Sequence, residues 1–249
     1  MGKKPRTPDP PRKVQAPQVR QKSSASESAL PWTNIGIGLA TVVLVGLVVA
    51  LLLVLSGGKG STKNVTPKEV ARVRAAMTAA GCTFTTSAAE ASNQHMSDPN
   101  QKAVYRTFPA GSGVHDPTTA LWGNYRNPAD PRQMVHNLEH GGIAVWYGPD
   151  ISPKDRGGLD AFYQDDPKAV LITPLRDPYP GVRYPQHDPL GSKIALTVWT
   201  ADAGNPDKGS VHVAICPRYD EAAFVAFRDA FRGKGPERFP VSKMVPGGN

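Results

Sequence analysis

The run Met134-Val-His-Asn-Leu-Glu-His-Gly-Gly-Ile-Ala-Val-Trp-Tyr147 places three titratable side chains directly before an apolar segment. Asp130 and Pro131 stand just ahead of it, and these residue types favour the N-cap and the first turn of a helix. Two glycines follow His140, and glycine is common where a helix stops. We therefore predict a short helix from Pro131 to His140 and a strand from Ile143 to Tyr147.

The predicted helix carries its titratable side chains on one side. At about 100° per residue, His136, Glu139 and His140 share one face, while Met134 and Leu138 point away from it. Histidines four residues apart lie on successive turns, so both imidazoles can reach one ion. The chain holds no other dense cluster of this kind.

A membrane-spanning helix is predicted upstream, at Ile35–Leu55. This run has no charged residue, and about 20 such residues form a helix that crosses a hydrocarbon core of roughly 30 Å. It is too long for the apolar part of a signal peptide and lacks a clean cleavage site, which favours an uncleaved anchor in the lipid bilayer. Seven basic residues precede it against two acidic ones, so we expect a cytoplasmic N-terminus and an extracytoplasmic C-terminal domain at the cell membrane.

Composition divides the chain into five parts. Residues 1–32, rich in Pro, Ser and basic residues, are expected to be a disordered cytoplasmic tail. The transmembrane helix (33–56), a linker (57–65), a folded domain (66–240) and a flexible C-terminal tail (241–249) follow. Most of the formal charge of +8 lies in the N-terminal tail, so the domain has no basic stripe and we expect no nucleic-acid partner.

The folded domain mixes short helices and strands. Thr66-Pro67 and Ser152-Pro153 are helix starts, and Phe224, Phe227 and Phe231 form the apolar stripe of a helix over Glu221–Phe231. Besides Ile143–Tyr147, strands are predicted at Cys82–Thr85, Ala103–Phe108, Ala169–Thr173, Ile194–Thr200 and Val211–Ile215, the last of them at a sheet edge. This order favours an α+β fold with a mainly antiparallel sheet and three to four helices.

Several segments of the chain match the pattern of a known family. They are His95 ahead of Val104-Tyr105, Gly111-Ser-Gly-Val-His115, Gly123-Asn-Tyr125, Val135-His-Asn-Leu-Glu-His-Gly141 running into Ile143-Ala-Val-Trp-Tyr-Gly-Pro149, Ile172-Thr-Pro174, Ala195-Leu-Thr-Val-Trp199 and Gly235-Pro-Glu237. From about Gly81 to Glu237 the chain resembles the bacterial membrane-anchored family known as domain of unknown function 3105. The resemblance implies a shared fold, and no activity comes with it.

The histidines support a metal-site hypothesis. Neutral imidazoles bind zinc or copper well, and a carboxylate can complete the coordination shell. The candidate ligands are His136, His140, His115, His95 and Glu139. Met96, next to His95, favours copper slightly because a thioether suits Cu(I).

A structural alternative stays open for the same residues. His136 would then pack beneath the turn at Gly111, His140 would interact with the helix dipole, and Glu139 would pair with Arg126 or Arg132. In that case the domain is a non-catalytic structural or interaction module, with an envelope protein as its partner.

Catalysis is the less favoured interpretation. His136-x-x-Glu139-His140 matches the inverted zinc-peptidase motif, in which the glutamate activates water. Those enzymes need a further carboxylate ligand downstream, and the predicted helix ends at the motif. No nucleophile-elbow, Rossmann or Walker pattern occurs in the chain.

The two cysteines, Cys82 and Cys216, both follow the predicted membrane helix. Disulfides persist outside the cytoplasm, so we predict a bridge between them. The alternative is that both are free thiols that join the metal site, which their spacing does not exclude. It would join the first strand to the last part of the domain.

Overall fold

The computed structural model describes residues 63–91, 93–98, 100–203 and 205–248, all within one compact unit. The predicted tail and the predicted membrane segment at Ile35–Leu55 lie outside these residues. Among the helices of the described part, none is long and apolar enough to cross a bilayer.

Four α-helices and one 3₁₀ helix occur in the described residues. The helices are α2 (Pro67–Ala79), α3 (Pro131–Glu139), α4 (Pro153–Asp165), α5 (Glu221–Phe231) and the 3₁₀ helix η1 (Val241–Lys243). The strands are β1 (Thr83–Ala88), β2 (Ala103–Val104), β3 (Ile143–Tyr147), β4 (Val170–Pro174), β5 (Val182–Arg183), β6 (Ile194–Asp202) and β7 (Asn205–Cys216). The predicted α+β class is confirmed.

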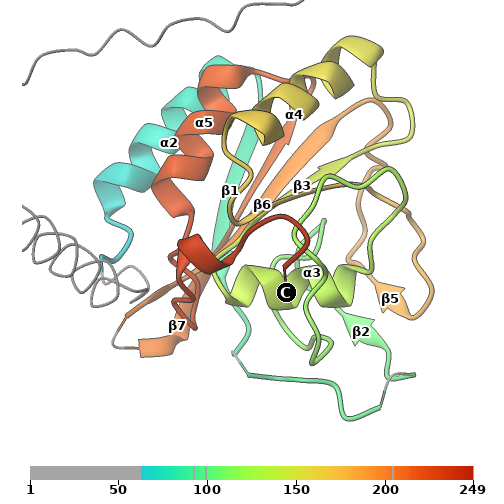
Figure 1. The fold of residues 1–249 in the computed structure, drawn as a ribbon, viewed down its shortest axis with the longest axis vertical. Helices are drawn as coiled ribbons and strands as arrows, with labels where there is room; N and C mark the ends of the chain where they lie inside the picture. Colours follow the sequence, from blue (N-terminus) through green and yellow to red (C-terminus); the bar gives the residue numbers. More distant parts are fainter. Residues whose placement is uncertain (1–62, 92, 99, 204, 249) are drawn as a thin grey trace, which may run out of the picture. The chain divides into compact units, whose positions relative to one another are not determined.

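The main sheet has the strand order β1-β7-β6-β3-β4 (Figure 1). Its pairs are antiparallel except β3 with β4, so the expectation of a mainly antiparallel sheet is also confirmed. Val211–Ile215 is not an edge, as we had expected, because β7 lies between β1 and β6. The predicted strand Ala103–Phe108 shortens to β2, whose partner in the described residues is the two-residue strand β5.

The two faces of the sheet are covered differently. Alternate residues of a strand point to opposite faces, so Ile143 and Val145 of β3 join an apolar core with residues of α2, α4 and α5. Ala144 and Trp146 point the other way and pack with Met134, Leu138 and loop residues. Figure 1 shows α2, α4 and α5 on one face and α3 on the other. We call these the helical face and the loop face.

Side-chain caps explain where the helices begin. At α2, Thr66 accepts a hydrogen bond from the backbone N–H of Glu69 (3.2 Å), and the Glu69 carboxylate accepts one from the Thr66 N–H (2.7 Å). This reciprocal pair satisfies two N–H groups that a helix start leaves without partners. Ser152 and Asp220 cap α4 and α5 through one hydrogen bond each.

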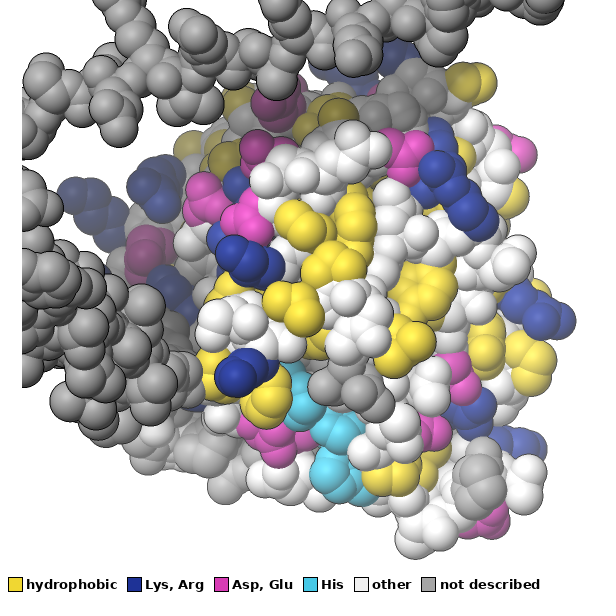
Figure 2. Space-filling model, viewed as in Figure 1, with side chains coloured by type: hydrophobic (Ala, Val, Ile, Leu, Met, Phe, Trp, Pro, Cys, Tyr) yellow, Lys and Arg dark blue, Asp and Glu magenta, His cyan; other side chains and the backbone are white. Residues whose placement is uncertain are grey.

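The surface carries mixed charge. In Figure 2, Lys and Arg side chains are interspersed with Asp and Glu over the visible face. Histidine side chains reach the surface together in the lower part of this view, beside acidic side chains. Surface charge is therefore spread out on this side, and histidine is concentrated in one place.

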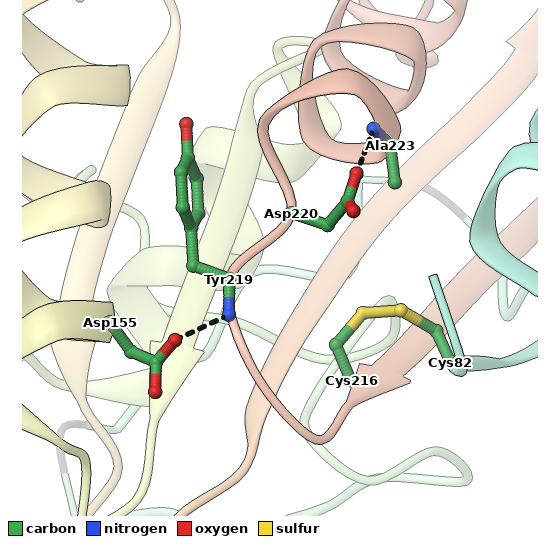
Figure 3. The surroundings of a disulfide bond; sticks show 6 residues. All are labelled: Cys82, Asp155, Cys216, Tyr219, Asp220 and Ala223. Carbon is green, nitrogen blue, oxygen red and sulfur yellow. Dashed lines mark hydrogen bonds between the residues drawn. A yellow bond between two sulfur atoms is a disulfide. The ribbon is translucent and has the colours of Figure 1, made fainter. Parts of the chain in front are cut away.

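The expected disulfide between Cys82 and Cys216 is present (Figure 3). It joins the start of β1 to the end of β7, and both cysteines are buried in the helical-face core. Tyr219, just beyond the bridge, donates its backbone N–H to Asp155 of α4 (2.9 Å). The bridge and this contact direct the chain from the sheet into α5.

The C-terminal segment packs onto the domain where we had expected a flexible tail from residue 241. Met244 is fully buried, and its carbonyl accepts a hydrogen bond from Ala169 (2.7 Å). The Trp122 N–H donates to the carbonyl of Gly248 (2.9 Å). The folded domain therefore extends past Pro240 to at least Gly248.

Candidate metal centre

Helix α3 begins at the predicted residue and ends one residue earlier than predicted, at Glu139, with His140 as its C-cap. Asp130 is the N-cap and accepts from the Arg132 N–H (2.9 Å), Pro131 opens the helix, and Gly141 follows the C-cap with a φ of 97°. The predicted polar face is not exposed to solvent, because Glu139 is fully buried and His136 is 7% exposed. Something other than water must therefore satisfy these polar groups.

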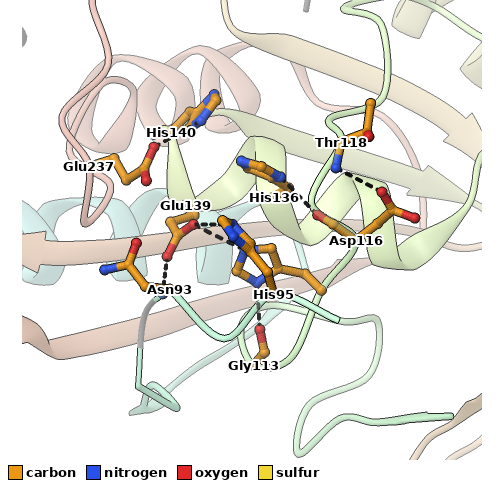
Figure 4. A network of polar contacts seen from close by, with 10 residues as sticks. Asn93, His95, Gly113, Asp116, Thr118, His136, Glu139, His140 and Glu237 are labelled. Atoms are coloured by element: carbon orange, nitrogen blue, oxygen red, sulfur yellow. Dashed lines mark hydrogen bonds and ion pairs between the residues drawn. The ribbon is translucent and has the colours of Figure 1, made fainter. Parts of the chain in front are cut away.

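Two loops cover the polar face of α3 (Figure 4). His95 and His115 pair as an isolated parallel bridge, in which Met96 N–H donates to the His115 carbonyl (2.7 Å) and His115 N–H donates to the Gln94 carbonyl (3.0 Å). Gly111 has no room for a Cβ, which would lie 2.2 Å from Val211. The glycine turn thus lets the loop approach the sheet and brings His115 over the helix.

His95, His115, His136 and Glu139 converge on one region. Each offers one ligand atom, and the four atoms lie within 4.8 Å of one another. Four points so spaced have a common centre at most about 2.9 Å from each, and bonds from zinc to imidazole nitrogen are roughly 2.0–2.1 Å long. A contraction of less than about 1 Å per ligand would therefore form a coordination shell around one ion.

Backbone carbonyls fix the orientation of two of the imidazoles. Nδ1 of His115 lies 2.7 Å from the Gly113 carbonyl, and Nδ1 of His136 lies 2.8 Å from the Asp116 carbonyl. A carbonyl only accepts, so each Nδ1 donates its proton, and in the neutral ring Nε2 carries a lone pair. Metal-binding histidines are commonly held in this way.

Electrostatics favours a neutral His136 and an ionised Glu139. Burial lowers the pKa of His136, and the neighbouring histidines lower it further. Burial alone would raise the pKa of Glu139, but the His115 imidazole and the hydrogen bond from the Asn93 N–H (2.6 Å) outweigh it, so that pKa is lowered. A neutral imidazole and a carboxylate are the forms that bind a metal ion.

No hydrogen bond joins the facing atoms of His115 and Glu139. Nε2 of His115 and Oε2 of Glu139 are 3.0 Å apart and buried, yet neither makes a well-aligned hydrogen bond to any described residue. With Nδ1 of His115 donating to Gly113, two electron-pair acceptors face each other. Either a shared proton or a cation is needed there, and the donor set fits a metal ion.

His140 belongs to a second group, with His136 and Glu237, whose ligand atoms also lie within 4.8 Å of one another. Nε2 of His140 is 2.9 Å from Oε2 of Glu237, and this contact lowers the pKa of the Glu237 carboxyl. All five candidate residues had been expected around one ion. In the structure the four others converge, while His140 faces Glu237 and shares only His136 with a group of its own (Figure 4).

Close backbone contact brings Glu237 to α3. Gly233 N–H donates to the Gly141 carbonyl (2.8 Å) and Glu237 N–H donates to the Glu139 carbonyl (3.1 Å). A Cβ on Gly235 would lie 2.3 Å from the Glu139 carbonyl oxygen. Sequence reasoning missed Glu237 as a site residue, and the Gly-x-Gly-Pro-Glu pattern around it was the available signal.

The expected pairing of Glu139 with Arg126 or Arg132 is wrong. Arg126 pairs with Asp160 (3.0 Å), and Arg132 pairs with Asp130 beside it (2.6 Å). The Met96 side chain is buried in the loop-face core. Glu139 instead meets His115 and the Asn93 backbone.

His187 and His212 lie apart from both groups. His187 pairs with Asp177 (2.6 Å). His212 stacks on Phe231, with ring centroids 4.4 Å apart, and its two ring nitrogens contact Thr86 and Thr200. Each is satisfied by its own neighbours.

A comparison with known families places the chain in one of them. The sequence model of a family described as protein of unknown function (DUF3105) matches residues 95–238, more than half of the chain. The matched range includes His95, His115, α3 and Glu237, whereas the predicted membrane segment lies outside it. No curated protein and no solved structure matches the chain. The protein is a member of the DUF3105 family of proteins of unknown function.

Proposed function

We propose that the protein binds one transition-metal ion, zinc or copper, through His95, His115, His136 and Glu139. The observation that carries the proposal is the buried contact of His115 with Glu139, where two electron-pair acceptors lie 3.0 Å apart among further imidazoles. A cation at their common centre removes this conflict. It also explains why a carboxylate is fully buried on α3.

The donor set favours a divalent ion. Three imidazoles and a carboxylate suit Zn²⁺ or Cu²⁺, while Cu⁺ prefers thiolate and thioether ligands. Cys82 and Cys216 are in a disulfide, and Met96 packs in the core. Soft ligands therefore do not contribute to this set.

Binding explains the geometry better than catalysis does. In the inverted zinc-peptidase motif the glutamate acts as a base on a water molecule. Here Oε1 of Glu139 accepts from Asn93, Oε2 faces His115, and the side chain has no solvent exposure. Glu139 is thus placed as a ligand.

The proposal includes location. An anchor at Ile35–Leu55 with a cytoplasmic N-terminus would hold the metal-binding domain outside the cytoplasm, and the charge asymmetry across that segment supports this orientation. Labelling of engineered single cysteines in intact cells, at Ser24 and at Lys63, tests it. Labelling at residue 63 alone by a membrane-impermeant reagent is expected, and labelling at residue 24 alone would refute it.

Elemental analysis tests metal binding directly. The full-length chain is purified in detergent without a histidine tag, beside Glu139→Gln, His115→Ala and the control His187→Ala. We expect about one zinc or copper ion per chain in the parent and the control, and clearly less than one ion per chain in the two site variants, because each loses a ligand and binds more weakly. Thermal unfolding shows whether each variant folds.

A metal-free parent that stays empty under zinc and copper titration would refute the proposal. The His115–Glu139 contact would then hold a proton, and the cluster would be part of the framework of a surface that binds an envelope protein.

A further inference from the structure

The second histidine group shares one residue with the first. His136 belongs both to the set with His95, His115 and Glu139 and to the set with His140 and Glu237. The rings of His136 and His140 lie on successive turns of the chain at the end of α3, with centroids 4.7 Å apart. Two overlapping positions for an ion therefore lie side by side.

His136 can serve only one of these positions at a time. Its Nδ1 is used by the Asp116 carbonyl at 2.8 Å, which leaves Nε2 as the single nitrogen for a metal. When an ion takes Nε2 in the first set, the second set keeps only His140 and Glu237. Two ligands of this kind fall short of the three or more protein ligands usual for bound zinc.

The second set has a buried nitrogen of its own that lacks a partner. Nε2 of His140 is 2.9 Å from Glu237, while Nδ1 is buried and has no hydrogen-bond partner among the described residues. Stacking on Phe239, with centroids 4.8 Å apart, holds the ring in place. A ring whose hydrogen bonds are incomplete, and whose Nε2 faces a carboxylate close to a second imidazole, is suited to binding a cation.

The two sets differ in donor number and in the exposure of their carboxylates. The first has four donors; its Glu139 carboxylate is fully buried, while the His95 side chain is 40% exposed. The second has three donors, and the Glu237 side chain is 34% exposed. Fewer ligands and an exposed carboxylate predict weaker and faster binding at the second set.

Building on the proposed function, we infer that His136, His140 and Glu237 form a second cation position, filled alternately with the first, through which a divalent ion passes to and from it. His136 keeps hold of the ion throughout. As the ion moves outward, His140 and Glu237 replace His95, His115 and Glu139 as its ligands. The ion therefore stays coordinated by the protein between the two positions.

Zinc titration of the full-length chain, with a chromophoric chelator as competitor, tests this inference. The parent is expected to bind one Zn²⁺ and no second ion of similar affinity. His95→Ala/His115→Ala is expected to bind one Zn²⁺ about 100-fold more weakly, and adding Glu237→Gln to it to weaken binding at least about tenfold more. Adding His187→Ala instead is the control and should change nothing.

Kinetics tests the passage of the ion. Glu237→Gln keeps an acceptor for His140 and removes the charge, so it should fold normally. In the otherwise unaltered chain it is expected to slow zinc loading and release by about tenfold each while the dissociation constant stays within about threefold. Stopped-flow measurements with the same chelator give both rates.

The possible outcomes separate the two proposals. If the parent binds zinc and a folded His95→Ala/His115→Ala protein binds none, the second position is refuted and the proposed function stands. If Glu237→Gln leaves both rates unchanged, the ion does not pass through this position. A parent without zinc affinity refutes the proposed function itself. If His95→Ala/His115→Ala fails to fold by circular dichroism, His95→Gln/His115→Gln replaces it.

Discussion

The two faces of the central sheet are covered by different kinds of side chain. On the helical face, α2, α4 and α5 cover the sheet with apolar side chains and a disulfide. On the loop face, one short helix and long loops enclose His115, Asn137 and Glu139, all fully buried. The helical face is held mainly by hydrophobic burial, with His212 as a buried polar side chain within it, whereas the loop face must satisfy several polar groups individually.

We expect this difference to separate stability from the proposed metal binding. Substitutions on the helical face should lower the free energy of unfolding and leave metal affinity of the folded protein unchanged. Substitutions on the loop face should change both.

The largest effect is expected from removing the disulfide by Cys82→Ser/Cys216→Ser. The bridge spans 134 residues, and a closed loop of that order stabilises a fold by about 4–5 kcal/mol in the chain-entropy model. Urea unfolding measures the loss, and zinc affinity below the transition should match the parent. A loss under about 1 kcal/mol would show that the unfolded chain gains little freedom when the bridge is absent.

Phe227→Ala should destabilise the helical face by about 4 kcal/mol. The ring is fully buried and packs against Phe84 and Phe231, so truncation leaves a cavity. Phe227→Leu is the matched control and should cost less than about 1.5 kcal/mol. A large drop in metal affinity of the folded Phe227→Ala protein would contradict the separation of the two faces.

Acid should destabilise the helical face through His212. Burial lowers its pKa from 6.5 to about 4 in the folded protein. The unfolded chain therefore binds a proton first as the pH falls, so stability is retained above about pH 6.5 and declines toward pH 4 by up to about 3 kcal/mol. His212→Gln should flatten the pH dependence of unfolding in this window, and an unaltered slope would exclude His212 as its source.

On the loop face, Asn137→Ala should lower both the free energy of unfolding and the zinc affinity. Its side chain accepts from the Ala120 N–H and donates to the Ala120 carbonyl, each at 2.9 Å, so truncation leaves buried backbone groups without partners at a cost of about 2 kcal/mol. The loop it ties down also carries His115 and Asp116, so zinc affinity should fall about tenfold. Phe227→Ala, with a greater loss of stability, is the comparison that makes this result specific.

Thr66→Ala should have the smallest effect, about 1 kcal/mol, because it removes the capping box of α2. Thr78→Ala is the control, since it makes the same chemical change at an exposed site in the same helix. Equal effects of the two substitutions would mean that the cap contributes nothing.

Local signals predicted the helix starts on both faces well and the arrangement of the loops on the loop face poorly. Thr66-Pro67, Asp130-Pro131 and Ser152-Pro153 each mark a helix start, and all three helices begin at the proline. Caps and apolar periodicity act over a few residues, so they can be read directly from the sequence. The fold class followed from these elements.

Long-range contacts account for what was missed. Val211–Ile215 had no local feature to show that β1 would pair with it and make it interior. Glu237 is nearly one hundred residues from Glu139, and close backbone contacts of residues 233–237 with Glu139 and Gly141 bring it to α3. The histidines could be named from the sequence, but their division into two overlapping sets depends on loop geometry that no periodic pattern encodes.

The strand order has a consequence for synthesis of the chain. Among the described residues, β1 has its one sheet partner in β7, and Cys82 finds its bridge partner at the end of that same strand. A nascent chain that has emerged only as far as α4 therefore exposes an unpaired strand and a free thiol. Ribosome-bound intermediates should remain open to chaperones and thiol oxidants until residue 216 appears, and the domain closes late, as a single unit.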